Sequence, residues 1–184
     1  MEAQDSKGKI IKENFPSEMV SIVGDILAGI VLSLLIISFQ SFILLILIIP
    51  ALLSLRGNLS GPFIARTSRD FIIGEFNFKS WFENVLATFS LSLLTAFAIG
   101  IVSILMNFLL VKLYIFNIGL LIVIPVVSIF FTLSISIPCS TLLNFIAFKR
   151  GLDPNSVVNP MMTAIDDFFT IICFYLTIIM LGVP

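Results

Sequence analysis

The 184-residue sequence contains no histidine, only two cysteines and few charged residues. The lack of histidine excludes His-ligated metal sites and acid–base catalysis by imidazole. Cys139 and Cys173 stand apart inside apolar runs, which is typical of packing residues. Charged residues make up 11% of the chain, where soluble domains carry about 25%, so the low charge excludes an ordinary soluble domain.

What the chain has in place of charge is a large share of apolar residues, 59% of the total. Uncharged runs of about 20 residues are what the core of a bilayer demands. The composition therefore predicts an all-α, multi-pass integral protein of the cell membrane. Residues 1–18 are polar and mixed in charge, which does not suit the core of a signal peptide. We expect residues 1–18 to form a cytoplasmic arm, either short and flexible or an amphipathic lead-in, and residues 19–184 to form a transmembrane domain.

Charged residues punctuate the apolar runs and predict five transmembrane helices. Between Asp25 and Arg56 lie thirty uncharged residues. One helix of that length would reach about 45 Å, against a bilayer core of about 30 Å, so we expect a turn near residues 38–41. Arg56 to Lys79 is predicted to be a polar connection. The expected spans are about 19–38, 41–57, 81–110, 120–148 and 154–182.

The distribution of Lys and Arg predicts the orientation of the chain. If the N-terminus lies inside, nine of the ten basic residues fall in the N-terminal arm or in the second and fourth connections. These nine are Lys7, Lys9, Lys12, Arg56, Arg66, Arg69, Lys79, Lys149 and Arg150. Only Lys112 falls outside, and the C-terminus is expected to be external.

Two of the predicted helices contain residues that interrupt helices. Pro125 and Pro138, with hydroxyl-bearing residues between them, predict a kinked or locally unwound fourth helix. Gly57-Asn58 follows Pro50 and predicts that the second helix ends in a left-handed or tight turn. Ordinary helix termination would explain this dipeptide as well as a functional role would.

The fifth predicted helix carries polar residues in a regular pattern. Asp153-Pro154 is a strong helix start, with Asp at the N-cap and Pro at the first helical position. From there Asn159, Thr163 and Asp167 follow at intervals of four residues, which places them on one face.

Pro160 adds a further oxygen to this helix, because it has no amide hydrogen and leaves a carbonyl near Ser156 free. A carboxylate, an amide, a hydroxyl and a carbonyl are all oxygen ligands. Hard cations such as Mg²⁺ and Ca²⁺ prefer oxygen ligands. The pattern therefore indicates a cation site.

Three further acids lie at membrane level, and each has two interpretations. An acid inside a span costs about 2.5–3.5 kcal/mol on insertion scales, so it faces the bundle interior or water. Asp166 lies about 100° around the helix from Asp167. It could be a further metal ligand, or it could cap a neighbouring helix or pair with an arginine. Asp25 and Glu83 could belong to the site or could sit at the membrane interface.

These residues resemble the MgtE family of magnesium channels and the related eukaryotic solute-carrier magnesium transporters. The segment from Gly151 to Asp167, with its Asp-Pro start and its Pro160, is similar to the last helix of that family. Pro50 followed by Gly57-Asn58 resembles the family's Pro…Gly-Asn signature. Glu83, after a basic residue at the head of the third helix, also fits. The resemblance covers about residues 19–183.

The resemblance implies a homodimer in the lipid bilayer, with one pore between the subunits that the fifth helix lines. It implies that Asp167 is the central pore carboxylate that holds hydrated Mg²⁺, the transported ion. Asn159 and Thr163 would line the pore below it, and Asp153 would lie at the cytoplasmic mouth. Asp166 stands where the family usually has a neutral residue. We expect no counterpart of the large cytoplasmic regulatory domains of the bacterial channels, and no nucleic-acid partner.

Three other functions fit parts of the pattern. A secondary transporter could exchange Mg²⁺ or another divalent cation for Na⁺ or H⁺, using the extra acids Asp25 and Asp166. An intramembrane aspartyl hydrolase could use Asp25 with Asp166 or Asp167. No second catalytic motif accompanies these residues, so we expect no enzymatic activity. The last alternative is a subunit or assembly factor without transport.

Overall fold

The computed structural model describes residues 7–38, 43–112 and 117–182, and it is built from helices. Within these residues no strand occurs, which confirms the predicted all-α class. A π-helical turn, η1 (Asn107–Val111), extends α3. The helices are α1 (Lys7–Ser38), α2 (Ile43–Ile72), α3 (Phe78–Met106), α4 (Leu120–Lys149) and α5 (Pro154–Met180).

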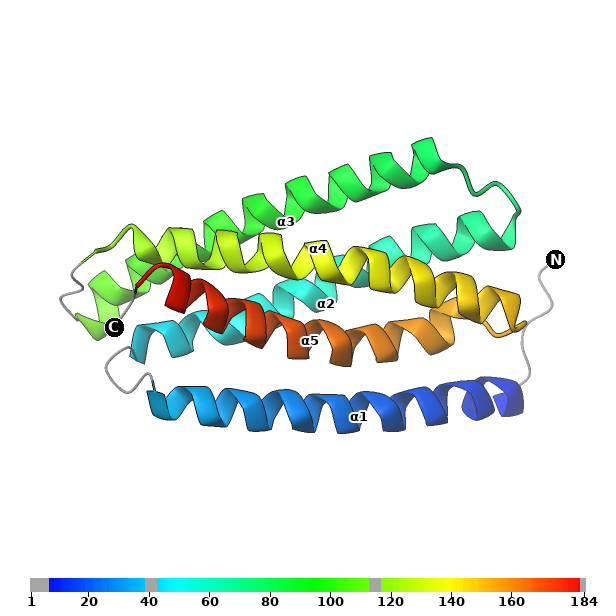
Figure 1. Cartoon of the computed structure of the whole chain (residues 1–184), viewed down its shortest axis with the longest axis horizontal. Coiled ribbons are helices and arrows are strands. Elements are labelled where there is room, and N and C mark those ends of the chain that lie inside the picture. Colours follow the sequence, from blue (N-terminus) through cyan, green and yellow to red (C-terminus); the bar gives the residue numbers. More distant parts are fainter. Residues whose placement is uncertain (1–6, 39–42, 113–116, 183–184) are drawn as a thin grey trace.

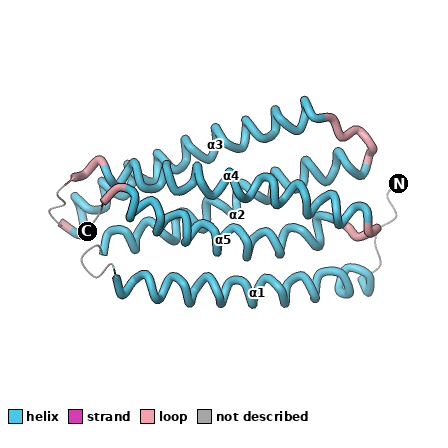
Figure 2. Tube along the Cα trace, in the orientation of Figure 1, coloured by secondary structure: helices cyan, strands magenta, loops and turns pink. Residues whose placement is uncertain are grey.

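The five helices lie lengthwise beside one another in an elongated bundle (Figure 1). α5 is the central helix and packs against α1, α2 and α4, whereas α3 packs on α2 and α4. α1 forms one side of the bundle and contacts it mainly through α5 (Figure 2). The start of α1, the α2–α3 connection and the α4–α5 connection lie at the same end.

Small residues let the helices approach closely at two places. A Cβ atom on Gly24 of α1 would lie 2.5 Å from the Cβ of Ala164 of α5. A Cβ atom on Gly100 of α3 would lie 2.6 Å from the Cα of Ile122 of α4. Lipid tails are as apolar as Leu side chains, so close packing of this kind holds membrane helices together.

Residues 7–18 belong to α1, which begins at Lys7 rather than at the predicted start of the first span near residue 19. Contacts with the start of α5 explain the extra turns. Glu13 accepts a hydrogen bond from the backbone N–H of Asp153 at 3.3 Å, and the Ser17 hydroxyl lies 3.3 Å from the carbonyl of Ser156. Tertiary contacts thus extend the helix beyond the apolar run.

The predicted end of the second helix at residue 57 is also wrong. α2 continues to Ile72 and includes the Gly57-Asn58 dipeptide, so most of the expected polar connection is helical. The left-handed glycine that follows the helix is Gly74, with φ 73°. A glycine inside a helix costs about 1 kcal/mol relative to alanine. We attribute the continuation to the polar contacts of the second half of α2, described below.

The fourth helix is not locally unwound as predicted, since α4 is helical from Leu120 to Lys149 through Pro125 and Pro138. Hydroxyl groups return hydrogen bonds to the helix itself around these prolines. Thr132 donates to the carbonyl of Ser128 at 2.8 Å, and Thr141 donates to the carbonyl of Ile137 at 2.9 Å. Bonds from a hydroxyl to the carbonyl four residues earlier often bend a helix without unwinding it, so the kink that the sequence also predicts stays a prediction.

Within the described residues four helical segments are long and apolar enough to cross a membrane. They are Ile10–Leu35, Phe78–Leu110, Leu120–Lys149 and Pro154–Met180. The side chains of residues 36–47 lie outside the described part, and they include the start of the second predicted span. A fifth span over α2 therefore stays a prediction.

The close contact at Gly100 yields a prediction about stability. Gly100→Ala places a methyl group against the α4 backbone, so we expect the free energy of unfolding to fall by about 1–3 kcal/mol. Gly29→Ala is the matched control, because a Cβ atom there meets nothing within 4 Å. Alanine in that exposed helix should be neutral or stabilising. Thermal unfolding in detergent micelles compares the two, and equal midpoints would contradict the close α3–α4 approach.

Candidate functional site

The start of α5 confirms the sequence prediction for Asp153 and Pro154. α5 begins at Pro154, and the Asp153 carboxylate accepts a hydrogen bond from the N–H of Asn155 at 3.1 Å. The Ser156 hydroxyl donates to the same carboxylate at 2.6 Å. These contacts satisfy donors at the helix end and fix the direction of α5. Asp153 is half-buried, so its carboxylate is not wholly enclosed by this cap.

Asn159, Thr163 and Asp167 form what we call the α5 stripe. Asn159 and Thr163 are exposed, and Asp167 is half-buried. This exposure contrasts with the central position of α5, which packs against α1, α2 and α4. The Thr163 hydroxyl donates to the carbonyl of Asn159 at 3.0 Å, which leaves the hydroxyl lone pairs available as acceptors. The stripe thus presents a row of oxygen atoms outside the folded core.

The carbonyl that Pro160 frees does not join this row. The Ser17 hydroxyl of α1 lies 3.3 Å from the carbonyl oxygen of Ser156 and 2.8 Å from that of Asn14. The oxygen that we predicted as a ligand therefore faces α1. Pro160 thus leaves this carbonyl free to accept a hydrogen bond from α1, which helps to join α1 to α5.

Asp166 lies on a different face of α5 from the stripe, inside the bundle. Its side chain and that of Arg56 of α2 are each 2% exposed, and Arg56 Nη2 lies 2.8 Å from Asp166 Oδ2. Ser60 of α2 also hydrogen-bonds Asp166, and Ser136 of α4 accepts from Arg56. The arginine-pairing interpretation of Asp166 is therefore what the structure shows. Arg56 is buried between helices. We had counted it among the basic residues of a cytoplasmic connection, and that assignment is wrong.

Breaking such a pair is costly, because it leaves one charge buried without compensation. Loss of a partner from a buried ion pair typically destabilises a protein by about 3–5 kcal/mol. The pair joins α2 directly to α5, and the Ser136 contact extends it to α4. It therefore fixes the rotation of α5 about its own axis, and with it the direction in which Asp167 points.

A row of buried polar side chains on α4 continues from this ion pair, and we call it the polar seam. Its members recur at intervals of four residues and are no more than 3% exposed: Ser128, Thr132, Ser136, Ser140 and Asn144. The buried Ser68 of α2 donates to the amide oxygen of Asn144 at 2.6 Å. Hydrogen bonds of this kind hold membrane helices together. The four-residue spacing was visible in the sequence, but we had interpreted it as a sign of kinking.

Asp25 of α1 lies near the α5 stripe. It is exposed, and the Ser21 hydroxyl lies 3.5 Å from its carboxylate. The charges of Asp25 and Asp166 both act on that of Asp167, as does the opposite charge of Arg56. Three carboxylates and one guanidinium therefore share this region. Asp25 and Asp167 are the two acids with solvent access.

Gly57 and Asn58 are exposed on α2. Gly61, four residues after Gly57, faces α5, because a Cβ atom there would lie 3.7 Å from Asn159 Oδ1. Gly57 and Asn58 stand one helical turn before Gly61, and a Cβ atom on Gly57 would meet nothing within 4 Å. The dipeptide that we predicted to end a helix thus lies inside α2, one turn from the glycine that faces Asn159.

Glu83 lies apart from this group, on the exposed surface of α3 near its start. α3 packs on α2 and α4 rather than on α5. Within the part of the chain that the structure describes, no three His, Cys, Asp or Glu side chains are grouped so that they could hold a metal ion. The oxygen atoms of the α5 stripe come from one carboxylate, one hydroxyl and one amide.

A comparison with models of protein families matches residues 49–177 to MgtE, described as a divalent cation transporter. The matched part covers α3, α4, most of α2 and most of α5, and it exceeds half of the 184 residues. A search of curated proteins finds no match.

The Arg56–Asp166 pair yields a prediction about stability. Asp166→Asn leaves the guanidinium buried without its counter-charge, so the free energy of unfolding should fall by about 3–5 kcal/mol. Arg69→Gln is a control of similar chemistry, because Arg69 is 72% exposed. We expect it to change stability by under 1 kcal/mol. The measurement is thermal unfolding of the purified protein.

A double variant tests whether the effect belongs to the pair. Combining Arg56→Met with Asp166→Asn removes both charges, so much of the lost stability should return. If the double variant loses the sum of the two single losses, the side chains do not interact as described.

Proposed function

The chain belongs to the MgtE family of divalent cation transporters, and from this premise we propose that it carries Mg²⁺ across the cell membrane through a dimeric pore. The observation that carries the proposal is the exposure of the α5 stripe. Asn159 and Thr163 are exposed and Asp167 is half-buried, although α5 is the central helix of the bundle. In a membrane, polar groups outside a folded core need water or a partner.

A second copy of the chain supplies that partner. One stripe on one helix cannot enclose an ion path, whereas a two-fold axis beside the stripe brings two copies face to face. Each ion would then meet two carboxylates, two hydroxyls and two amides. Mg²⁺ dehydrates reluctantly, and oxygen atoms spaced around a retained water shell suit it. Rings of Asp in a water-filled pore favour cations and repel anions.

The ion pair sets how much charge the pore presents. Arg56 compensates Asp166 inside each subunit, so Asp166 contributes little net negative charge to a passing ion. Asp167 then supplies the charge of the filter, and Asp25 supplies a second charge near it. In this proposal Asp166 is a positioning residue that holds the α5 stripe toward the pore, and Glu83 and Asp153 lie at the ends of their helices outside the filter.

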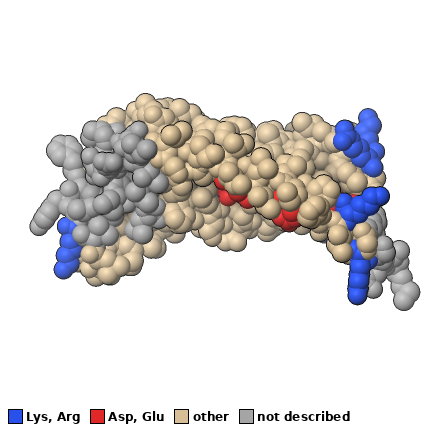
Figure 3. All heavy atoms as spheres, turned by 90° about the horizontal axis from the view of Figure 1, so that it is seen from below, with Lys and Arg blue, Asp and Glu red and all other residues tan. Residues whose placement is uncertain are grey.

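The proposed orientation places the N-terminus and the two connections beside it in the cytoplasm. Figure 3 shows basic side chains gathered at one end of the molecule, with a smaller basic group at the other end. The gathered end is the end where α1 begins. Basic residues are retained on the cytoplasmic side of membrane proteins, which supports this orientation.

A coupled exchanger is the second function that a specific observation favours. The charge of Asp25 acts on Asp167, and paired acids can bind a coupling ion such as Na⁺ or H⁺. Mg²⁺ flux into liposomes that hold only this protein separates the two functions. A pore passes Mg²⁺ in response to membrane potential alone, whereas an exchanger needs an opposing Na⁺ or H⁺ gradient.

Replacement of Asp167 tests the proposed filter. Asp167→Asn keeps the shape and hydrogen bonding of the side chain but removes one negative charge per subunit. In a site shielded from bulk water this charge sets the energy of the cation. We expect the Mg²⁺ flux to fall at least tenfold while the protein still inserts and folds. Liposome uptake, normalised to folded protein, is the measurement.

Asp166→Asn is the matched control for this experiment, since it removes the neighbouring charge from the buried face. Per folded molecule it should reduce flux less than Asp167→Asn does. Normal flux in Asp167→Asn together with loss of flux in Asp166→Asn would contradict the assignment of the two faces of α5.

Cross-linking tests the proposed dimer. Thr163→Cys, in a background without Cys139 and Cys173, places a thiol on the α5 stripe. A short bifunctional thiol reagent should join two copies in membranes. Met161→Cys is the control, because it lies about 200° around α5 from Thr163 and should stay uncoupled. An active protein that remains strictly monomeric would contradict the proposal.

A further inference from the structure

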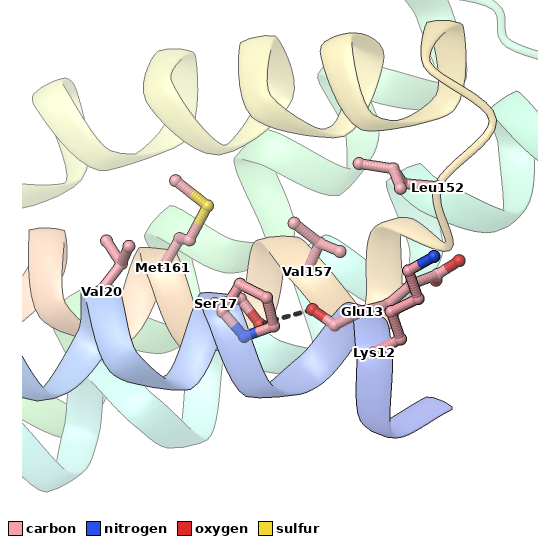
Figure 4. A pocket seen from close by; sticks show the side chains of 8 residues that line it. Lys12, Glu13, Ser17, Val20, Leu152, Val157 and Met161 are labelled. Atoms are coloured by element: carbon pink, nitrogen blue, oxygen red, sulfur yellow. Dashed lines mark hydrogen bonds between the residues drawn. The ribbon is translucent and has the colours of Figure 1, made fainter. Parts of the chain in front are cut away.

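A groove runs between α1 and α5 along the outside of the bundle. It consists of two adjoining cavities of about 510 Å³ and 220 Å³. Both cavities are lined by Val20 of α1 and Met161 of α5, so they form one continuous feature. We call it the α1–α5 groove. Figure 4 shows its wider part, with side chains from α1, α5 and the segment before α5.

The two ends of the groove differ in chemistry. At one end Lys12, Glu13 and Ser17 line the wider cavity. The narrower cavity has an apolar lining that includes Leu27 and Phe168. Its floor is closed where Gly24 meets Ala164. A ligand that fits this groove needs a polar head at one end and a hydrocarbon tail at the other.

The charged side chains at the polar end of the groove determine which headgroup the groove can bind. Two opposite charges line this end and differ in exposure: Lys12 is exposed, whereas Glu13 is half-buried and its carboxylate accepts a hydrogen bond from the backbone N–H of Asp153, so the cation is the charge on the outer surface. Basic side chains also gather at this end of the molecule (Figure 3). An anionic head is therefore favoured over a zwitterionic one.

The length of the groove matches one leaflet of a bilayer. From Lys12 to Leu27 there are fifteen steps along α1, or about 22 Å at 1.5 Å per residue. A bilayer with its headgroups is about 40–45 Å thick, so one leaflet measures about 20–22 Å. The groove also runs along the helices, which is the direction of an acyl chain.

The groove lies on the side of α5 away from the α5 stripe. Met161 and Ile165 of the groove each precede a stripe residue by two positions, which is about 200° around the helix. If the stripe faces a pore between two subunits, the groove faces lipid. This last step rests on the proposed function, whereas the shape and charge of the groove do not.

We propose that the α1–α5 groove binds one anionic phospholipid, with its phosphate at Lys12 and an acyl chain along Val20, Met161 and Phe168. The bound lipid would cover the seam where α1 meets α5. Because α1 contacts the bundle mainly through α5, the lipid would hold both helices at once.

The test uses the full chain in phosphatidylcholine vesicles without Mg²⁺. Trace spin-labelled phosphatidylglycerol or spin-labelled phosphatidylcholine reports the lipid that the protein immobilises. One lysine near a membrane surface favours an anionic lipid about fivefold, so we expect the wild-type protein to prefer phosphatidylglycerol by about that factor. Lys12→Gln should abolish the preference. Lys7→Gln, an equal loss of charge on α1 outside the groove lining, should keep it.

A second pair of variants tests the tail. Val20→Phe fills the groove and should reduce the immobilised fraction of both lipids, whereas Val23→Phe is outside the lining and should not. Equal effects of Lys12→Gln and Lys7→Gln would overturn the proposal. So would cross-linking of Met161→Cys between two copies, because a second chain would then occupy the groove. Asp167→Asn should leave the lipid signal unchanged, which separates this result from failure of the pore proposal.

Discussion

The buried contact between Arg56 and Asp166 is the constraint on which the arrangement of the bundle depends. Two opposite charges taken out of water must stay together, so α2 and α5 cannot rotate or slide independently. Ser136 brings α4 into the same contact, and the polar seam on α4 continues it toward Asn144. The direction of Asp167 follows, because neighbouring residues on a helix lie about 100° apart and the rotation of α5 is fixed at Asp166.

The ion pair also explains why two adjacent acids can stand in an apolar helix. Neighbours on a helix lie about 100° apart, so one side chain can face the core while the other faces outward. Asp166 is compensated by Arg56 of the same chain and joins α5 to α2. Asp167 is half-buried and keeps its access to solvent. Two identical neighbouring residues thus differ in environment: Asp166 is paired and buried, and Asp167 is half-buried.

Local signals predicted the parts of the fold that local interactions decide. The start of α5 is set by the Asp153 cap and Pro154, and both are recognisable from sequence. The continuation of α2 past Gly57 was not recognisable, because it depends on contacts with α4 and α5 that are distant in sequence. Arg56 shows the same limit. A basic residue beside a glycine looks like the end of a span until its buried partner is known.

The position of α1 has a consequence for the two acids Asp25 and Asp167. α2, α3, α4 and α5 contain the ion pair and the polar seam among themselves, whereas α1 joins them mainly through α5. The docking of α1 therefore rests on its contact with α5, which is the most extensive between two helices in the described part of the chain. Asp25 is carried on α1, so it meets Asp167 only once that docking is complete. The approach of the two acids thus depends on the contact between α1 and α5 rather than on the buried ion pair.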